Sequence, residues 1–268
     1  MDEFARAEAI LAILERTGRV TVSELTRQLN VSAVTVRKDL ESLEQRAMLR
    51  RVRGGAIGIT STDEGSFDMR LRRGRDVKRA IADVVAASVG DGEVIAMDAS
   101  TTCFYVAEVL LERRDLIVIT NGLKAAMLFL ERSNAMVIMP GGVLRRSAGS
   151  MVGQFGDVLA ARGTIDKGFF GVKGLSVTHG LMEMAIEEAE AKKHLVASCA
   201  QVYGLFDSTK VGRFGLHSFA PVRSITGLYT DDRMPAVEIT AWRQAGVTVT
   251  AVPHPGDEHA ADTARSAS

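Results

Sequence analysis

The first third of the chain carries apolar residues at helical spacing, interrupted by short turn signals. Four apolar side chains at i, i+3, i+4 and i+7 predict an amphipathic helix over residues 3–16. An alternating piece, Val20 to Val22, predicts a short strand, and Ser23 is the expected N-cap of a second helix. Asn30-Val31 is typical of a turn, and Ser32 is the expected N-cap of a third helix. The pattern therefore predicts a helix-turn-helix.

The third predicted helix has one apolar side and one polar, basic side. Val36, Leu40 and Leu43 fall together on the apolar side. In helix-turn-helix proteins such a helix enters the major groove, where Arg and Lys donate to guanine and a Thr methyl group contacts thymine. An ordinary three-helix bundle with a solvated surface is the alternative interpretation. The candidate DNA-binding residues of this helix are Ser32, Thr35, Arg37 and Lys38.

A strand-like segment rich in arginine follows this helix. Residues 48–56 alternate between apolar and polar positions and include Arg50, Arg51 and Arg53. A β-wing that returns beside Val20 to Val22 places these cations on the DNA phosphates that flank the groove. Such contacts position a protein on DNA without reading its sequence. The segment therefore favours a winged helix-turn-helix over a plain helical bundle.

From residue 75 onward, strand and helix patterns alternate along the chain. This spacing predicts an α/β fold class, in which a Rossmann-like parallel sheet, covered by helices on both faces, follows the winged helix-turn-helix. The predicted strands are 93–97, 116–120, 135–139, 166–171, 203–206 and 247–252, and the predicted helices are 76–89, 101–111, 122–131, 187–196 and 236–245.

The loops that follow the predicted strands are small, polar or glycine-rich. Ligands bind at the carboxyl ends of parallel strands, and free N–H groups at helix N-termini attract anions. Taken singly, each loop is better explained as a helix cap or a turn, but three of them on one edge favour a binding site. For Glu188, an i, i+4 pair with Lys192 is an equally good interpretation. The candidate ligand-binding residues are Asp98, Ser100, Thr101, Thr102, Thr120, Asn121, Gly141, Gly142, Glu188 and Lys210.

Composition and charge narrow the class of protein. No apolar run reaches the roughly 20 residues of a membrane span, and the charged N-terminus lacks a signal-peptide core, so a cytoplasmic location is expected. The two cysteines are far apart and form no cluster with histidine, which predicts neither a disulfide nor a metal site. The net charge is zero, yet residues 27–79 carry 13 Lys and Arg against 7 Asp and Glu. This local excess suits the DNA phosphate backbone.

The N-terminal motifs resemble those of a known family. Residues 20–56 read VTVSELTRQLNVSAVTVRKDLESLEQRAMLRRVRGGA. This run resembles the N-terminal signature of the DeoR family of repressors, whose pattern contains "EL", "VS..T.R.DL..LE" and a terminal "R..GGA". Ala47 is a departure, since family members usually carry a glycine there to close the helix.

The remainder, from about 76 to 232, resembles the C-terminal sugar-sensing domain of the same family. That domain is similar in fold to ribose-5-phosphate isomerase, which implies a pocket for a phosphorylated sugar. Ser100 stands where the loop commonly has Gly, and Thr209 where Ser is common, which leaves the identity of the effector open. The matching motifs are KRAIA at 78–82, DASTT at 98–102, TN at 120–121, GG at 141–142, DKGFFG at 166–171, EA..K at 188–192 and DSTK at 207–210.

These patterns and the resemblance together give an expected organisation. The chain should comprise a winged helix-turn-helix DNA-binding domain, a linker, an effector-sensing domain and a disordered tail, at residues 1–57, 58–75, 76–253 and 254–268. The expected partners are an operator in double-stranded DNA and a small phosphorylated sugar or similar effector, with no cofactor. A homo-oligomer is expected because such readers commonly pair on two half-sites.

Three functions are consistent with the sequence. The leading one is a repressor of carbohydrate genes, not an enzyme, whose hold on DNA an effector controls. The alternative is an isomerase-like enzyme with an accessory DNA-binding head, in which Asp98, Glu188 and Lys210 serve as base, acid and electrostatic stabiliser. The third is an architectural DNA-binding protein without an effector.

Overall fold

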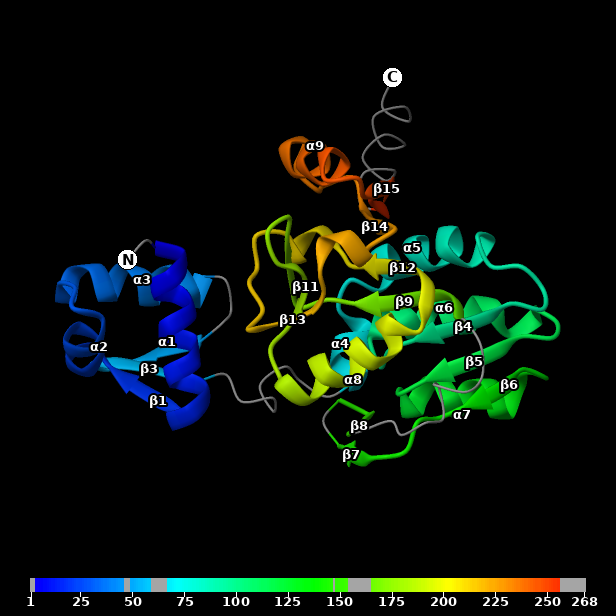
Figure 1. Cartoon of the computed structure of the whole chain (residues 1–268), viewed down its shortest axis with the longest axis horizontal. Coiled ribbons are helices and arrows are strands. Elements are labelled where there is room, and N and C mark those ends of the chain that lie inside the picture. The colour runs from blue at the N-terminus through cyan, green and yellow to red at the C-terminus, as the bar shows by residue number, and fades with distance from the viewer. Residues whose placement is uncertain (1–2, 46–48, 59–66, 147, 154–164, 256–268) are drawn as a thin grey trace, which may run out of the picture. The chain divides into compact units, whose positions relative to one another are not determined.

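The computed structural model describes residues 3–45, 49–58, 67–146, 148–153 and 165–255 (Figure 1). The chain divides into two compact units, residues 1–65 and residues 66–268. The disordered tail expected from residue 254 lies almost wholly outside the described residues. Within the described ranges, every helix is too short or too polar to cross a bilayer.

The N-terminal unit is a winged helix-turn-helix. Three helices pack on a small antiparallel sheet whose strand order is β1-β3-β2, and the hairpin of β2 and β3 is the predicted wing. The expected return of the wing beside the first strand is confirmed. The elements are α1 (Glu3–Thr17), β1 (Arg19–Thr21), α2 (Val22–Leu29), α3 (Ala33–Gln45), β2 (Leu49–Val52) and β3 (Gly55–Gly58).

The start of α2 differs from the prediction. Thr21, not Ser23, is its N-cap: Glu24 N donates to Thr21 Oγ1 at 3.2 Å, and Thr21 N donates to Glu24 Oε2 at 2.9 Å. This reciprocal capping box satisfies two backbone N–H groups, which Ser23 at the second helical position does not do. The expected turn is confirmed, because Asn30 ends α2 in the left-handed conformation, with φ 53°. Ser32 caps α3 as predicted, since its Oγ accepts from Thr35 N at 3.1 Å.

Two interactions fix α3 within this unit. Arg6 of α1 makes a two-pronged ion pair with buried Asp39, at 2.8 and 3.0 Å. At the other end of α3, Glu44 Oε1 accepts from Arg51 N of the wing at 2.8 Å. The wing also approaches β1 so closely that a Cβ on Gly55 would lie 2.0 Å from Val20 O. Only glycine therefore fits at residue 55.

The C-terminal unit contains the predicted parallel sheet. Its seven strands run in the order β15-β14-β12-β9-β4-β5-β6, and every neighbouring pair is parallel. The strands are β4 (Val94–Met97), β5 (Ile117–Thr120), β6 (Met136–Ile138), β9 (Ile165–Gly171), β12 (Cys199–Leu205), β14 (Gly227–Asp231) and β15 (Thr248–Val252). The α/β fold class is confirmed.

Alternating strand residues supply two cores, one on each face of the sheet. Ile95 and Phe169 join one core, whereas Ala96 and Phe170 join the other, as the two-residue period of a strand requires. The first core contains α5, α6 and α7, and the second contains α8 and α9. The helices are α5 (Arg75–Ala87), α6 (Thr101–Val109), α7 (Leu123–Arg132), α8 (Ile186–Ala197) and α9 (Ala236–Gln244).

Strand β14 of the parallel sheet was not predicted, and neither were three short features outside that sheet. A hairpin of β7 (Val143–Arg145) and β8 (Ser150–Val152) follows β6, and β10 (Gly174–Ser176), β11 (Gly180–Glu183) and β13 (His217–Ala220) form a small antiparallel sheet. Within the linker expected over 58–75, residues 67–72 form the helix α4 (Phe67–Arg72). Phe67 is buried and meets the Phe104 ring edge-on at 5.5 Å, as the docking of this segment requires.

The topology directs attention to one point of the sheet. From β4 the chain proceeds outward through β5 and β6, then returns to β9 on the other side of β4 and proceeds outward again. The order therefore reverses between β4 and β9. At such a reversal, the loops at the carboxyl ends of the two strands separate and leave room for a ligand.

Candidate functional site

The outer side of α3 carries the predicted base-reading residues. Arg37 and Lys38 are exposed, and Ser32 and Thr35 lie at the start of the helix with their hydroxyls 2.8 Å apart. The buried residues of α3 are Val36, Leu40 and Leu43, as expected from their spacing. The cationic groups thus face solvent while the apolar side holds the unit together.

The wing presents the predicted arginines next to this helix. Arg50, Arg51 and Arg53 are all exposed, and Gly54 allows the tight turn between β2 and β3 with φ 84°. A surface groove runs between α2, α3 and the wing turn, lined by Val22, Ser23, Thr26, Arg27, Ala33, Arg37 and Gly54. Arg27 and Ser23 were not among the predicted contacts. Their exposure could have been predicted from the helical spacing of buried Leu25 and Leu29.

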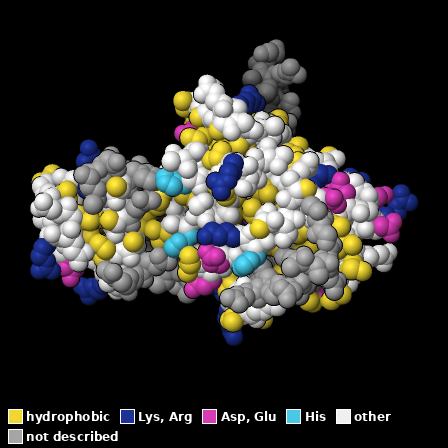
Figure 2. All heavy atoms as spheres, in the orientation of Figure 1, with side chains coloured by type: hydrophobic (Ala, Val, Ile, Leu, Met, Phe, Trp, Pro, Cys, Tyr) yellow, Lys and Arg dark blue, Asp and Glu magenta, His cyan; other side chains and the backbone are white. Residues whose placement is uncertain are grey.

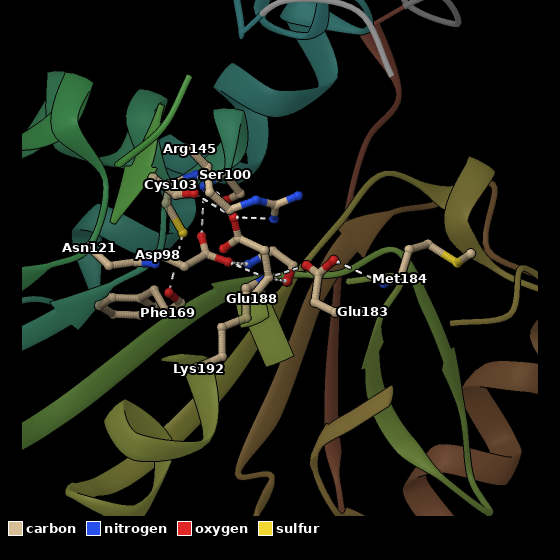
Figure 3. A network of polar contacts seen from close by, with 12 residues as sticks. Asp98, Ser100, Cys103, Asn121, Arg145, Phe169, Glu183, Met184, Glu188 and Lys192 are labelled. Carbon is tan, nitrogen blue, oxygen red and sulfur yellow. Dashed lines mark hydrogen bonds and ion pairs between the residues drawn. The ribbon is translucent and has the colours of Figure 1, made fainter. Parts of the chain in front are cut away.

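In the second unit, Asp98 occupies the reversal point of the sheet. It is buried, and all its contacts are polar (Figure 3): Oδ1 accepts from Ser100 N at 2.9 Å, and Oδ2 accepts from Gly171 N at 2.9 Å. Lys192 Nζ lies 2.6 Å from the same Oδ2 atom. Burial by itself would raise the pKa of Asp98, but Lys192 and the Ser100 hydrogen bonds hold it below its ordinary value.

Lys192 joins the two halves of this network. Besides Asp98, its Nζ contacts Glu183 Oε1 at 2.5 Å, donates to Gly171 O at 2.7 Å and lies 4.8 Å from the centre of the Phe219 ring. Burial would lower the pKa of Lys192, but the two carboxylates beside it raise that pKa well above its ordinary value. Lys192 is therefore a permanently charged ammonium that neutralises one of two buried carboxylates.

Glu188 belongs to a neighbouring pair. Its Oε1 lies 2.8 Å from Arg145 Nη1 and accepts a short hydrogen bond from Ser150 Oγ, so the β7–β8 hairpin is tied to α8. The structure thus gives Glu188 and Lys192 different partners from the i, i+4 pairing that their spacing also allows.

Of the three predicted loops, those after β4 and β5 lie against each other at the carboxyl edge, and the end of β9 joins them. A Cβ on Gly122, after β5, would lie 2.9 Å from Ala99 Cα, and a Cβ on Gly171 would lie 2.4 Å from Ser100 Cβ. Asn121 is fully buried, and its Nδ2 donates to Met151 O of β8 at 3.1 Å. Its Oδ1 is buried without a hydrogen-bond partner among the described residues. A buried acceptor in this state costs about 1–3 kcal/mol, so a donor from a ligand would be favourable there.

Several predicted residues have structural roles at this edge. Ser100 caps α6, because its Oγ accepts from Cys103 N at 3.2 Å, and Thr120 Oγ1 accepts from Gly122 N at 3.0 Å. Thr101 and Thr102 are buried in the first turn of α6. Gly141 is exposed, and Gly142 has φ 146° with a notional Cβ 2.3 Å from Val152 O, so the hairpin itself requires glycine there.

Lys210 lies apart from the Asp98 network, in the turn after β12. Its charge and those of Arg70 and Arg73 act on Lys78, a buried lysine in the first turn of α5. Lys78 Nζ donates to the carbonyls of Arg70 and Arg73, each at 2.6 Å, and so holds the end of α4. Burial, opposed by the charge of Asp207, lowers the pKa of Lys78 to about 8.

Four residues of the network were not predicted: Lys192, Glu183, Arg145 and Ser150. Lys192 is part of the EA..K motif, which was the available signal for it. Glu183, Arg145 and Ser150 lie on short strands whose residues show no periodic pattern. Among the described residues, no group of three or more His, Cys, Asp or Glu side chains is arranged to hold a metal ion.

A winged helix-turn-helix with an exposed basic face, joined to an α/β unit with a polar site at its switch point, defines a DNA-binding regulator with a ligand-sensing domain. Residues 6–62 match the "DeoR-like helix-turn-helix domain", and residues 74–232 match the "DeoR C terminal sensor domain". The chain belongs to the DeoR family of transcriptional regulators.

Curated relatives agree with this membership along nearly the whole chain. The HTH-type transcriptional regulator GolR of Listeria innocua is 32% identical over 93% of this chain and 98% of its own length. A putative aga operon transcriptional repressor of Escherichia coli O157:H7 is 29% identical, over 91% and 92%. The glycerol-3-phosphate regulon repressor of Escherichia coli K12 is 26% identical, over 88% and 93%.

Among solved structures, the similarity in both fold and sequence is low. A D-ribose-5-phosphate isomerase with phospho-erythronic acid overlaps 52% of this chain and 55% of its own, with TM-score 0.41 and 15% identity. The sorbitol operon regulator SorC of Klebsiella pneumoniae overlaps 91% and 99%, with TM-score 0.40 and 12% identity. Similarity this low carries no functional inference.

Proposed function

We propose that this regulator represses genes of carbohydrate metabolism from the cytoplasm, and that a small phosphorylated sugar or related metabolite controls its hold on an operator. The winged helix-turn-helix unit, called the reader below, contacts base edges through Ser32, Thr35, Arg37 and Lys38. The wing arginines contact phosphates. Two relatives are named repressors, one of them of a glycerol-3-phosphate regulon, which supports both the sign of regulation and the class of effector.

The observation that carries the effector site is the buried, unpaired Oδ1 of Asn121 beside the loop of Asp98. Asn121 and the carboxylates of Asp98, Glu183 and Glu188 offer acceptors, which suit the hydroxyl groups of a sugar. A phosphate would be repelled by this group, because Asp98, Lys192 and Glu183 carry a net negative charge. We therefore propose that the phosphate lies near the first turn of α6, with Lys210 as its cationic partner.

An effector of this kind acts by differential binding. If it binds the DNA-free arrangement of an oligomer more tightly than the DNA-bound one, it shifts the population away from DNA, and DNA must weaken effector binding by the same factor. The remaining predicted contacts, from Ser100, Thr101, Thr102, Thr120, Gly141 and Gly142, belong to the loops that surround this site.

The charge states disfavour the isomerase alternative. A general base works best with a pKa near the working pH, whereas Lys192 and the Ser100 hydrogen bonds hold the pKa of Asp98, the base of that alternative, below its ordinary value. Asp98 and Lys192 are also engaged with backbone atoms, which suits a binding site better than proton transfer. Aldose–ketose interconversion that disappears in Asp98→Asn would reverse this preference.

The direct test is a thermal-shift screen of the purified chain against phosphorylated sugars and polyols, followed by operator-binding titrations with each compound that stabilises it. Lys210→Ala should bind the operator normally and respond weakly to the compound, whereas Lys193→Ala, an exposed lysine on α8, should respond as the wild type does. A wild-type response in Lys210→Ala would remove Lys210 from the site. A screen in which no compound shifts the melting temperature would favour the architectural alternative.

A further inference from the structure

The outer side of α7 is apolar. It is nevertheless exposed, because none of the described residues covers it. Leu123, Met127 and Leu130 are 36%, 43% and 70% exposed and recur at i, i+4 and i+7, so they form one stripe. The opposite side of the same helix, with Ala125 and Phe129, is buried in the core. A helix that is apolar on both sides belongs between two bodies, and the described structure supplies only one.

The stripe continues into neighbouring elements. Leu123 N donates to Gly149 O at 2.9 Å, which sets the β7–β8 hairpin beside the start of α7. Figure 2 shows hydrophobic side chains on the surface around the end of the sheet that β6 forms. The full surface, called here the α7 patch, comprises Leu123, Met127, Leu130, Met136, Val143 and Leu144, all exposed. Exposed apolar side chains gathered on neighbouring elements mark an interaction site.

We propose that the α7 patch joins two copies of this chain about a two-fold axis, with the two α7 helices antiparallel. The charges beside the stripe fit this arrangement. Lys124 and Glu131 are both exposed and stand seven residues apart, on the same flank of the stripe. In an antiparallel pair of identical helices, equivalent flanks face each other, so Lys124 of each copy meets Glu131 of the other.

The same features favour a second copy over a different partner. A two-fold contact must be complementary to itself, and one helix here carries both the apolar stripe and a balanced pair of opposite charges in the order that this requires. The three-residue strand β6 ends the sheet on this side, so the contact also covers a sheet edge. Met127, near the middle of the stripe, falls close to the proposed axis.

The proposed function assumes a homo-oligomer, and this inference, which rests on that assumption, names the surface that joins its subunits. Its test needs neither DNA nor effector, so it can fail while the regulatory function stands. A segment of the same chain is the competing occupant of the α7 patch, and the first experiment distinguishes it from a second copy.

The first experiment is sedimentation analysis of the full chain with Leu130→Glu. We expect the wild type to be at least a dimer and the variant to have half its mass, with an unchanged circular-dichroism spectrum. Val237→Glu is the matched control, because Val237 is 73% exposed on α9, far along the sequence, and should leave the mass unchanged. A variant with wild-type mass, or a monomeric wild type, would overturn the proposal. So would loss of stability without loss of mass, which would indicate a segment of the same chain over the patch.

The second experiment is a charge exchange. Lys124→Glu and Glu131→Lys should each weaken self-association by roughly tenfold, because each change makes two symmetry-related attractive pairs repulsive. The double variant restores both pairs with reversed sign, so it should associate like the wild type. Additive weakening in the double variant would show that the two side chains do not meet across the axis.

Discussion

The reader and the C-terminal α/β unit, called here the sensor, place their charged side chains in opposite environments. Arg37, Lys38 and the wing arginines are exposed, whereas Asp98 and Lys192 are buried and paired. In the reader, the fold near the proposed binding face is held by apolar residues and by the Arg6–Asp39 and Glu44–Arg51 contacts, none of which involves the side chains of Arg37 or Lys38, so binding and stability are separable there. In the sensor, the buried pair of Asp98 and Lys192 holds the fold and also belongs to the proposed effector site. Substitutions should therefore separate affinity from stability in the first unit and couple them in the second.

The largest expected effect is on the stability of Lys192→Met. Removing the ammonium leaves the carboxylates of Asp98 and Glu183 buried without their counter-ion, which should reduce the free energy of unfolding by about 3–5 kcal/mol. Urea unfolding measured by circular dichroism checks this. Lys193→Met is the neighbouring control, since Lys193 pairs with Glu190 at the surface, and it should unfold like the wild type. Equal stability of the two variants would contradict the coupling of site and fold.

The reader should show the reverse behaviour in the double variant Arg37→Ala, Lys38→Ala. Loss of two cationic contacts to base edges should weaken operator binding by roughly 100-fold, and loss of their positive charge should reduce the salt slope by about 1. Fluorescence anisotropy at several salt concentrations measures both quantities. The melting temperature should stay unchanged because both side chains are exposed. A folded variant with wild-type affinity would show that α3 does not read the operator.

The pH dependence of stability at Lys78 tests the coupling of buried charge and fold in the sensor. Its pKa is about 8 in the native chain against an ordinary value of 10.5, so between these values the unfolded chain holds a proton that the native chain lacks. The contribution of Lys78 to stability therefore rises with pH across this window and is lost as pH falls through about 8. The stability difference between wild type and Lys78→Met should change by about 3 kcal/mol across the window. A difference that is constant with pH would contradict this.

The smallest expected effect concerns the cap of α2. Thr21→Ala removes the acceptor for Glu24 N and should reduce the stability of the reader by about 1 kcal/mol. Ser23→Ala should have little effect, although Ser23 is the residue that the sequence pattern favours as the cap. Thermal unfolding of the two variants decides between them, and a larger loss in Ser23→Ala would reverse the assignment.

The sequence predicts the regular elements because their periodicity reflects burial directly. Ile10, Leu11 and Leu14 of α1 and Val36, Leu40 and Leu43 of α3 are all buried, as their spacing requires. The strands of the parallel sheet are short apolar runs between helices, and their order of alternation is enough to predict the α/β class. The strand-end loops follow from that class, so Asp98 and Asn121 were found by position alone.

The other charged and polar residues around Asp98 could not be predicted in the same way. Glu183 lies 85 residues away along the chain, on a short strand of a separate sheet, and its contact with Lys192 depends on how that sheet packs. Arg145 and Ser150 lie on a hairpin whose residues carry no periodic signal. Lys192 and Glu188 stand one helical turn apart, a spacing that favours a mutual pair, but packing against other elements gives each a closer partner.

The hydrogen bond from Arg51 N to Glu44 has a consequence for the kinetics of operator search. It joins the end of α3 to the first strand of the wing, so the helix proposed to read the groove and the hairpin proposed to contact phosphates are oriented together before any DNA is present. Binding to DNA therefore requires little further ordering of the backbone and loses little conformational entropy. The reader can therefore sample successive registers along a duplex as one preformed surface, and the lifetime of each complex, more than the speed of its formation, should distinguish an operator from other DNA.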